Sequence, residues 1–237
     1  MIERNFYLQQ IISKMWDGNI KVITGIRRCG KSTLLFDLFN SFLINSGVKE
    51  ECIIKIELDK RKYLKFRNPI YLCEYVENII KDSEDKYYLF IDEVQLTNVV
   101  TDEGSGIDVT IYDMLNELRG YKNLDCYVTG SNSKMLSSDI ATEFRGRSSQ
   151  IKVYPLSFSE LYSYKNMDKR ELLDEYMEFG GMPGLININS DIDKKNYLNN
   201  LYNEIYIKDL VEHGKIRRED VLNEILNGRR SISTTSA

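Results

Sequence analysis

The chain has 237 residues, enough for one large or two modest domains, and 42% of them are hydrophobic, so it can bury a core. Its formal net charge of −4 argues against a wholly basic surface for nucleic acid, although a local basic patch is compatible with it. No apolar run has the length of a membrane span, and Met1-Ile2-Glu3-Arg4 does not open a signal peptide, so we expect a cytoplasmic protein without a membrane partner.

The first predicted elements are a short helix over residues 6–15 and a strand over residues 20–24. A helical run over residues 33–44 follows, with apolar side chains at helical spacing and a stop at Asn45-Ser46-Gly47. A second strand over 52–58 and a second helix over 70–81 repeat the alternation. This order of elements is typical of a parallel sheet covered by helices.

Between the first strand and its helix lies Gly25-Ile26-Arg27-Arg28-Cys29-Gly30-Lys31-Ser32, which has the spacing of a phosphate-binding loop. Glycines allow the backbone turns that aim successive N–H groups at an anion, and the following helix adds its positive dipole end. Lys31 can reach the β- and γ-phosphates, and the Ser32 hydroxyl suits Mg²⁺. We expect a nucleotide to be bound by nine residues: Gly25, Ile26, Arg27, Arg28, Cys29, Gly30, Lys31, Ser32 and Thr33. A chance match is the alternative, and the strand-to-helix context disfavours it.

Cys29 lies inside this loop. The nearby charge of Lys31 predicts a lowered pKa for the Cys29 thiol, and an adduct on the sulfur would then obstruct the anion. The alternative is an inert small residue.

The third strand, beginning at Tyr87, is a run of bulky residues that ends in Asp92-Glu93. Carboxylates at the carboxyl end of such a strand project where ligands bind in parallel sheets. We expect Asp92 to hold the Mg²⁺ that Ser32 also contacts, and Glu93 to orient or deprotonate an attacking water. A strand that simply ends at a solvated turn is the alternative.

Residues 97–110 read as a polar surface insertion, with a partner-binding or lid role as the alternative. A helix over 111–118 and a strand over 124–129 follow, and the strand leads into Ser131 and Asn132. At least one of these two side chains is expected to sense the γ-phosphate, although both also suit a helix N-cap.

Arg145 and Arg147 precede a fifth strand over residues 150–154. An arginine placed near the transferring phosphoryl group, in the same or a neighbouring subunit, would stabilise the transition state. A solvated surface arginine is the alternative.

Five stretches of the chain together resemble a prokaryotic AAA+ (ASCE P-loop) ATPase family. They are the phosphate-loop sequence, Phe90-Ile91-Asp92-Glu93-Val94-Gln95, Val128-Thr129-Gly130-Ser131-Asn132-Ser133, Phe144-Arg145-Gly146-Arg147 and Pro155-Leu156-Ser157-Phe158. The resemblance covers about residues 2–222. It implies a sheet in which the sensor strand separates the Asp-Glu strand from the loop strand. It also implies ATP or ADP with Mg²⁺, Ser131 as sensor, and Arg145 or Arg147 as the arginine finger.

After Pro155 the pattern changes to helices alone, over 158–164, 169–179 and 194–212. We therefore expect an ATPase core over residues 1–155, a helical lid or linker over 156–226, and a disordered tail over 227–237. The resemblance implies a further uncharacterised C-terminal domain that is largely absent here, so the chain reads as truncated.

The predicted fold class is α/β: a three-layer AAA+-like P-loop NTPase core with a five-stranded parallel sheet, followed by a small helical lid. The predicted function is Mg²⁺-dependent hydrolysis of ATP to ADP and phosphate, coupled to conformational change. The alternatives are a nucleotide-dependent switch with little turnover and a DNA-associated AAA+ module. A second copy or a protein partner is expected at the helical region, while the net charge does not support nucleic acid as a partner.

Overall fold

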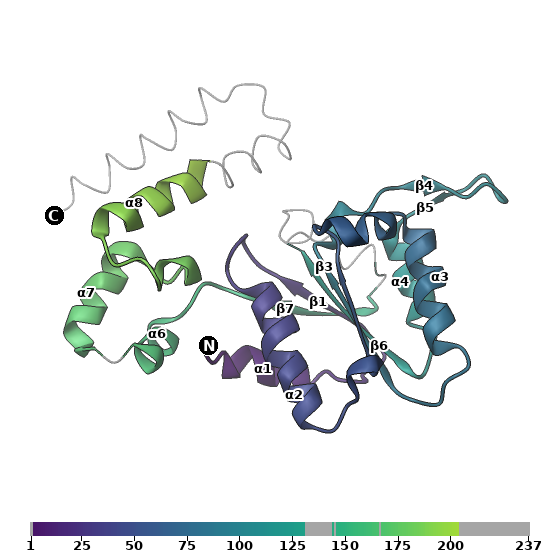
Figure 1. Ribbon diagram of the computed structural model, residues 1–237, viewed down its shortest axis with the longest axis horizontal. Helices are drawn as coiled ribbons and strands as arrows, with labels where there is room; N and C mark the ends of the chain where they lie inside the picture. The colour runs from purple at the N-terminus through teal and green to yellow at the C-terminus, as the bar shows by residue number, and fades with distance from the viewer. Residues whose placement is uncertain (1, 131–143, 145, 166, 204–237) are drawn as a thin grey trace. The chain divides into compact units, whose positions relative to one another are not determined.

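The computed structural model describes residues 2–130, 144, 146–165 and 167–203 (Figure 1). The chain divides into two compact units, Met1–Ile186 and Asn187–Ala237. The predicted sensors Ser131 and Asn132, the arginine-finger candidate Arg145 and the predicted tail lie outside the described residues.

A five-stranded parallel sheet forms the centre of the first unit. Its strands lie in the order β2 (Ile53–Glu57), β3 (Tyr87–Asp92), β6 (Leu124–Gly130), β1 (Ile20–Thr24) and β7 (Ser148–Lys152). The predicted sheet is thereby confirmed, including the position of β6 between β1 and β3 that the family resemblance implies.

Helical segments cover both faces of this sheet, because successive residues of each strand point to opposite sides. On one side, Val22, Leu89 and Val128 join a core with α3 (Pro69–Ile80) and α4 (Ile111–Leu118). On the other, Ile23, Phe90 and Tyr127 pack with α1 (Asn5–Ile12), η1 (Thr33–Phe39) and α2 (Asn40–Asn45). The three-layer prediction is therefore confirmed.

The helix predicted over 33–44 has two parts, the π-helix η1 and then α2. In a π-helix, residues five apart are neighbours along the axis, and fully buried Leu34 and Phe39 have this spacing. The 3.6-residue period used to predict the helix does not separate the two forms. The phosphate loop is thus followed by a wider turn than we expected.

Local capping explains where two other helices begin. Asn68 accepts hydrogen bonds from the backbone N–H groups of Ile70 and Tyr71, and Pro69 occupies the first turn of α3. Thr110 and Asp113 form a reciprocal capping box at the start of α4. Three short 3₁₀ turns complete the connections: η2 (Glu50–Cys52), η3 (Arg61–Arg67) and η4 (Val94–Leu96).

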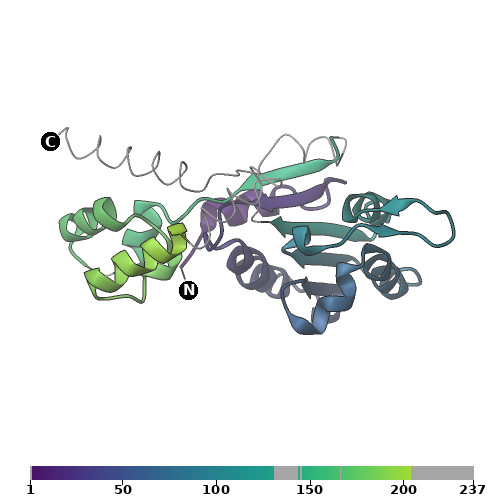
Figure 2. The ribbon, with the colours of Figure 1, turned by 90° about the horizontal axis from the view of Figure 1, so that it is seen from above.

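The predicted polar insertion contains a small antiparallel hairpin, β4 (Val100–Thr101) with β5 (Asp108–Val109). Figures 1 and 2 both show this hairpin extending away from the helices of the unit. Asp102 closes its tip by accepting hydrogen bonds from Ser105 and, through its carbonyl, from the N–H of Gly106.

Helices α6 (Phe158–Tyr164) and α7 (Lys169–Phe179) occupy the residues predicted for them and belong to the first unit. They share a small core of Leu156, Leu161 and Leu172, and the 3₁₀ turn η6 (Pro183–Leu185) follows. In the second unit, α8 (Asp191–Asn200) contains the start of the helix predicted over 194–212. Among the described residues, none of the helices combines the length and the apolarity that crossing a bilayer requires.

Candidate functional site

The predicted phosphate loop leaves the carboxyl end of β1 and turns sharply before η1. Gly25 has φ +156°, and a Cβ placed on it would meet the Val153 carbonyl oxygen at 2.3 Å. Gly30 and Arg28 also have positive φ, of +96° and +63°. Positive φ values at these positions suit the anion-binding concavity that the sequence predicts.

Lys31 follows this bend and is 4% exposed. Its Nζ donates a hydrogen bond of 3.1 Å to the Ile26 carbonyl, so its ammonium group lies within the loop. Arg27 and Arg28 are exposed. Of the three cations in the loop, Lys31 is therefore the buried one that lies against the loop backbone.

The structure corrects the prediction for Cys29. Its thiol is fully buried, and its Sγ donates to the Val153 carbonyl at 3.5 Å. Burial raises the pKa of the Cys29 thiol, and the nearby charges of Lys31 and Arg4 only partly offset that effect. The prediction of a lowered pKa is wrong because it considered the charge without the desolvation.

Asp92 and Ser32, the two predicted metal ligands, are in direct contact. The Ser32 Oγ donates a 2.7 Å hydrogen bond to Asp92 Oδ2, while the buried Thr129 hydroxyl donates to the other carboxylate oxygen. Burial raises the pKa of Asp92, and the hydrogen bonds from Thr129 and Ser32 oppose that shift. Strand periodicity explains why Asp92 and Thr129 meet. Each lies two residues beyond Phe90 or Tyr127 on its strand, so both side chains point to the sheet face that η1 covers.

Thr129 is a site residue that we did not predict. Besides its bond to Asp92, its Oγ1 accepts the Glu93 N–H at 3.2 Å. One hydroxyl on β6 therefore holds both residues of the acidic pair. The signal was present in the period of two along β6, because Thr129 is two residues beyond buried Tyr127.

Glu93 occupies the first position after β3 in a left-handed conformation, with φ +55° and ψ +50°. A non-glycine residue in this region is uncommon and costs conformational energy, so surrounding contacts must hold it there. One such contact is a hydrogen bond that the Gln95 amide donates to Glu93 Oε2. Gln95 is thus a second residue of the site that we did not predict.

Arg147 lies at the amino-terminal end of the parallel strands, whereas the loop follows the carboxyl-terminal end of β1. Its carbonyl accepts the Ile20 N–H at the beginning of β1. Its side chain is exposed. The structure therefore brings together Lys31, Ser32, Asp92 and Glu93, but does not bring Arg147 to them.

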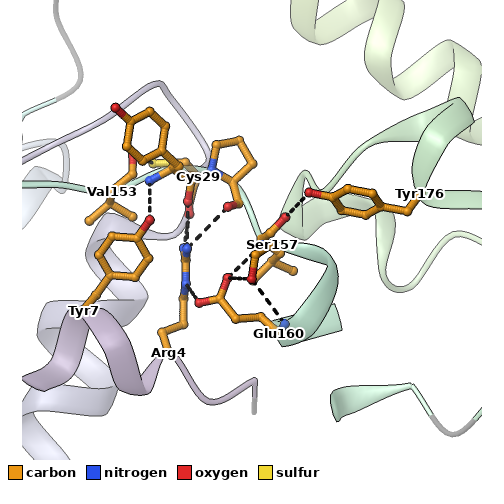
Figure 3. A network of polar contacts seen from close by, with 10 residues as sticks. Arg4, Tyr7, Cys29, Val153, Ser157, Glu160 and Tyr176 are labelled. Carbon is orange, nitrogen blue, oxygen red and sulfur yellow. Dashed lines mark hydrogen bonds and ion pairs between the residues drawn. The ribbon is translucent and has the colours of Figure 1, made fainter. Parts of the chain in front are cut away.

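A third residue outside our predictions, Arg4, contacts the loop backbone at Cys29 (Figure 3). Arg4 is 4% exposed, and its Nη1 donates to the Cys29 carbonyl at 2.9 Å. Its Nε contacts Glu160 at the start of α6. No spacing rule connects residue 4 with residue 29, so only the fold could show this contact.

The donors present fit a nucleotide with Mg²⁺. A side chain at position 25 would strike the Val153 carbonyl, so the backbone bend is available only to glycine. The hydroxyl of Ser32 and the carboxylate of Asp92 are hard oxygen ligands of the kind Mg²⁺ takes, and their 2.7 Å contact places both at one point.

Comparisons with known proteins bear on the family and the fold of this chain. A family model described as an AAA domain matches residues 17–162, more than half of the chain. The chain belongs to the AAA domain family. Residues 170–231 match a second model, described as a domain of unknown function (DUF8612). This corrects our expectation that an uncharacterised C-terminal domain is largely absent, because the AAA domain is followed by such a domain in this chain.

The relatives of this AAA domain protein share about a third of its residues. It is 31% identical over 231 residues to an uncharacterised protein of Haemophilus influenzae, covering 95% of this chain and 54% of that protein. It is also 31% identical over 221 residues to the uncharacterised protein MJ1544 of Methanocaldococcus jannaschii, covering 86% of this chain and 44% of that one. The chain thus spans about half the length of these curated relatives.

A solved structure shares the fold of this AAA domain protein. The Walker-type ATPase PABY2304 of Pyrococcus abyssi superimposes with a TM-score of 0.50 at 17% identity. The superposition covers 98% of this chain and 76% of that one. At this identity the likeness establishes the fold, and the fold class predicted from sequence is confirmed.

Proposed function

We propose that this protein binds ATP with Mg²⁺ and hydrolyses it to ADP and phosphate. The observation that carries the proposal is the contact between Ser32 at the end of the loop and Asp92 at the end of β3. Two motifs 60 residues apart in the chain meet at one point through side chains suited to one metal ion.

Each residue has a separate role in this proposal. The backbone N–H groups of residues 25–32 surround the phosphates, and the ammonium group of Lys31 forms ion pairs with the β- and γ-phosphates. Ser32 and Asp92 would hold Mg²⁺, which when bound neutralises charge that develops on the phosphate oxygens. Glu93 orients the attacking water or accepts its proton.

Ser131 and Asn132 as sensors, and Arg145 or Arg147 as arginine finger, remain part of the proposal. Thr129 supports the sensor assignment, because the strand that carries it leads directly into Ser131. A hydroxyl or amide at that place could report the presence of the γ-phosphate to β6.

Glu93→Gln tests the chemical step, and Lys31→Ala tests binding. We expect Glu93→Gln to bind ATP but to lose turnover by about 10²–10⁴-fold, the usual contribution of a general base. Steady-state phosphate release and calorimetry with ATP measure the two effects. Hydrolysis that is unchanged in Glu93→Gln would remove Glu93 from this role, and ATP binding unchanged in Lys31→Ala would reject the proposed phosphate site.

A regulatory switch with little turnover is a second candidate, favoured by the hydrogen bond from Gln95 to Glu93. An oxygen that accepts from Gln95 is less available to a water molecule. In a switch, Gln95→Ala should raise the rate of a single turnover. An unchanged or lower single-turnover rate would speak for the hydrolase alone.

A further inference from the structure

Arg4 makes more polar contacts than a structural ion pair requires. Its Nε donates to Glu160 at 3.0 Å, its Nη1 to the Cys29 carbonyl at 2.9 Å, and its Nη2 to the carbonyls of Tyr154 at 2.8 Å and Pro155 at 3.5 Å. Its guanidinium also lies 4.5 Å from the centre of the Tyr7 ring. One buried cation therefore joins the phosphate loop, the chain leaving β7, and α6.

The bond to Cys29 acts on the part of the loop that would face a phosphate. The Cys29 carbonyl and the Gly30 N–H belong to one planar trans peptide and point in opposite directions. A guanidinium that holds the carbonyl on the outer side of the loop therefore turns the Gly30 N–H toward the inner side. Gly30 itself has φ +96°, a conformation that glycine adopts without a Cβ penalty.

Glu160 holds the guanidinium in place. The exposures of the two side chains are 4% for Arg4 and 17% for Glu160, so their charges are shielded from water. The second carboxylate oxygen of Glu160 accepts from the N–H and the hydroxyl of Ser157, which forms the capping box of α6 (Figure 3). The first turn of α6 is thereby attached to the loop through two side chains.

We propose that Arg4 is a positioning residue of the phosphate loop, fixing the Cys29–Gly30 peptide, and that Glu160 couples this peptide to the start of α6. This inference rests on the proposed function, since it assigns a role at the same phosphate site. Lysine cannot replace the arginine, because a single ammonium group does not reproduce the planar fork that reaches several acceptors at once.

Titration calorimetry with ATP and with inorganic tripolyphosphate tests the role. Tripolyphosphate reports on the loop without the nucleoside. We expect Arg4→Lys and Arg4→Met to weaken both ligands by about tenfold, the scale of one lost hydrogen bond to a charged group. Glu160→Gln should weaken them less, because glutamine keeps the capping box but not the ion pair. Arg170→Lys, on the exposed surface of α7, is the matched control and should bind as the parent does.

A second measurement separates positioning from general stability. The amide resonance of Gly30 should shift when tripolyphosphate is added to the parent protein, and should shift much less in Arg4→Lys. Arg4→Lys that folds, binds tripolyphosphate like the parent and shows the same Gly30 shift would overturn the inference. If instead neither the parent nor Lys31→Ala binds either ligand, the proposed function itself fails, whatever Arg4 does.

Discussion

Six charged side chains are buried among the described residues, and five of them fall into two groups; the sixth, Lys194 in α8, pairs with Asp191. Arg4, Lys31 and Asp92 surround the candidate phosphate site. Lys21 and Asp125 are inside the sheet face covered by α1, where no ligand role is assigned. The first group lies at the proposed phosphate site, and the second is an ion pair that joins β1 to β6.

Lys21 is fully buried, and its Nζ lies 2.5 Å from Asp125 and 2.9 Å from Asp17. Removing one partner of a buried pair leaves the other charge without compensation. We therefore expect Lys21→Met to lower the free energy of unfolding by about 3 kcal/mol, measured by denaturant titration. Lys49→Met is the control, because the Lys49–Asp85 pair is exposed, and it should change stability much less. Equal effects would show that burial does not decide the strength of the Lys21 pair.

Cys29 should be slow to react with iodoacetamide at about pH 8, because burial raises its pKa and little thiolate forms. Mass spectrometry of native and denatured protein measures the modified fraction of the peptide that contains Cys29. Alkylation of native Cys29 as fast as in the denatured protein would contradict the buried position. Since reactivity depends on both pKa and access, the sequence alone could not predict the outcome.

Site residues that were predictable from sequence lie in two short stretches whose spacing is fixed by chemistry. Lys31 and Ser32 follow the glycines of the loop, and Asp92-Glu93 ends an apolar strand. Thr129, Gln95 and Arg4 were not predicted, because their roles depend on which elements become neighbours. Of these, only Thr129 had a local signal.

At the scale of elements, the strands were predicted to within a few residues, because continuous apolar runs mark buried parallel strands. The helical segments were less predictable in detail. The π-helical form of η1 and the β4–β5 hairpin were missed, since neither has a distinctive period over so few residues. The sequence also did not predict where two backbone segments pack closely, and the glycines after α7 are an example.

The Gly180-Gly181-Met182-Pro183-Gly184 stretch combines a helix end with a tight contact. Gly180 has φ +72° after α7, and a Cβ on Gly181 would lie 1.9 Å from the Leu156 carbonyl oxygen. The Leu156 N–H also donates to the Gly181 carbonyl at 2.7 Å. Position 181 therefore requires glycine for packing.

We expect Gly181→Ala to destabilise the first unit by roughly 1–3 kcal/mol, the cost of overpacking. Thermal and denaturant unfolding measure the change. Gly104→Ala in the hairpin is the control, since its Cβ would meet its nearest neighbour at an ordinary 3.5 Å. Gly181→Ala with parental stability would mean that Leu156 moves away without cost.

For the whole molecule, the first compact unit includes α6 and α7 together with the sheet. A core that ends at residue 155 and a separate lid over 156–226 remain predictions. Arg147 also remains one. Because it lies at the amino-terminal end of the strands and the loop lies at their carboxyl-terminal end, we expect it to act, if it serves as an arginine finger, on a phosphate bound by another copy. Because the chain spans about half the length of its curated relatives, what those proteins do as a whole is not carried over.

The position of Arg4 has a consequence for related chains. The AAA domain match begins at residue 17, so this guanidinium and the Tyr7 hydroxyl that accepts the Tyr154 N–H both precede the matched segment. A homologue could keep the loop glycines, the lysine and both acidic residues of the site, yet bind phosphate more weakly because a residue that precedes all of them has changed. The proposed role of Arg4 thus makes anion binding depend partly on a residue outside the matched segment.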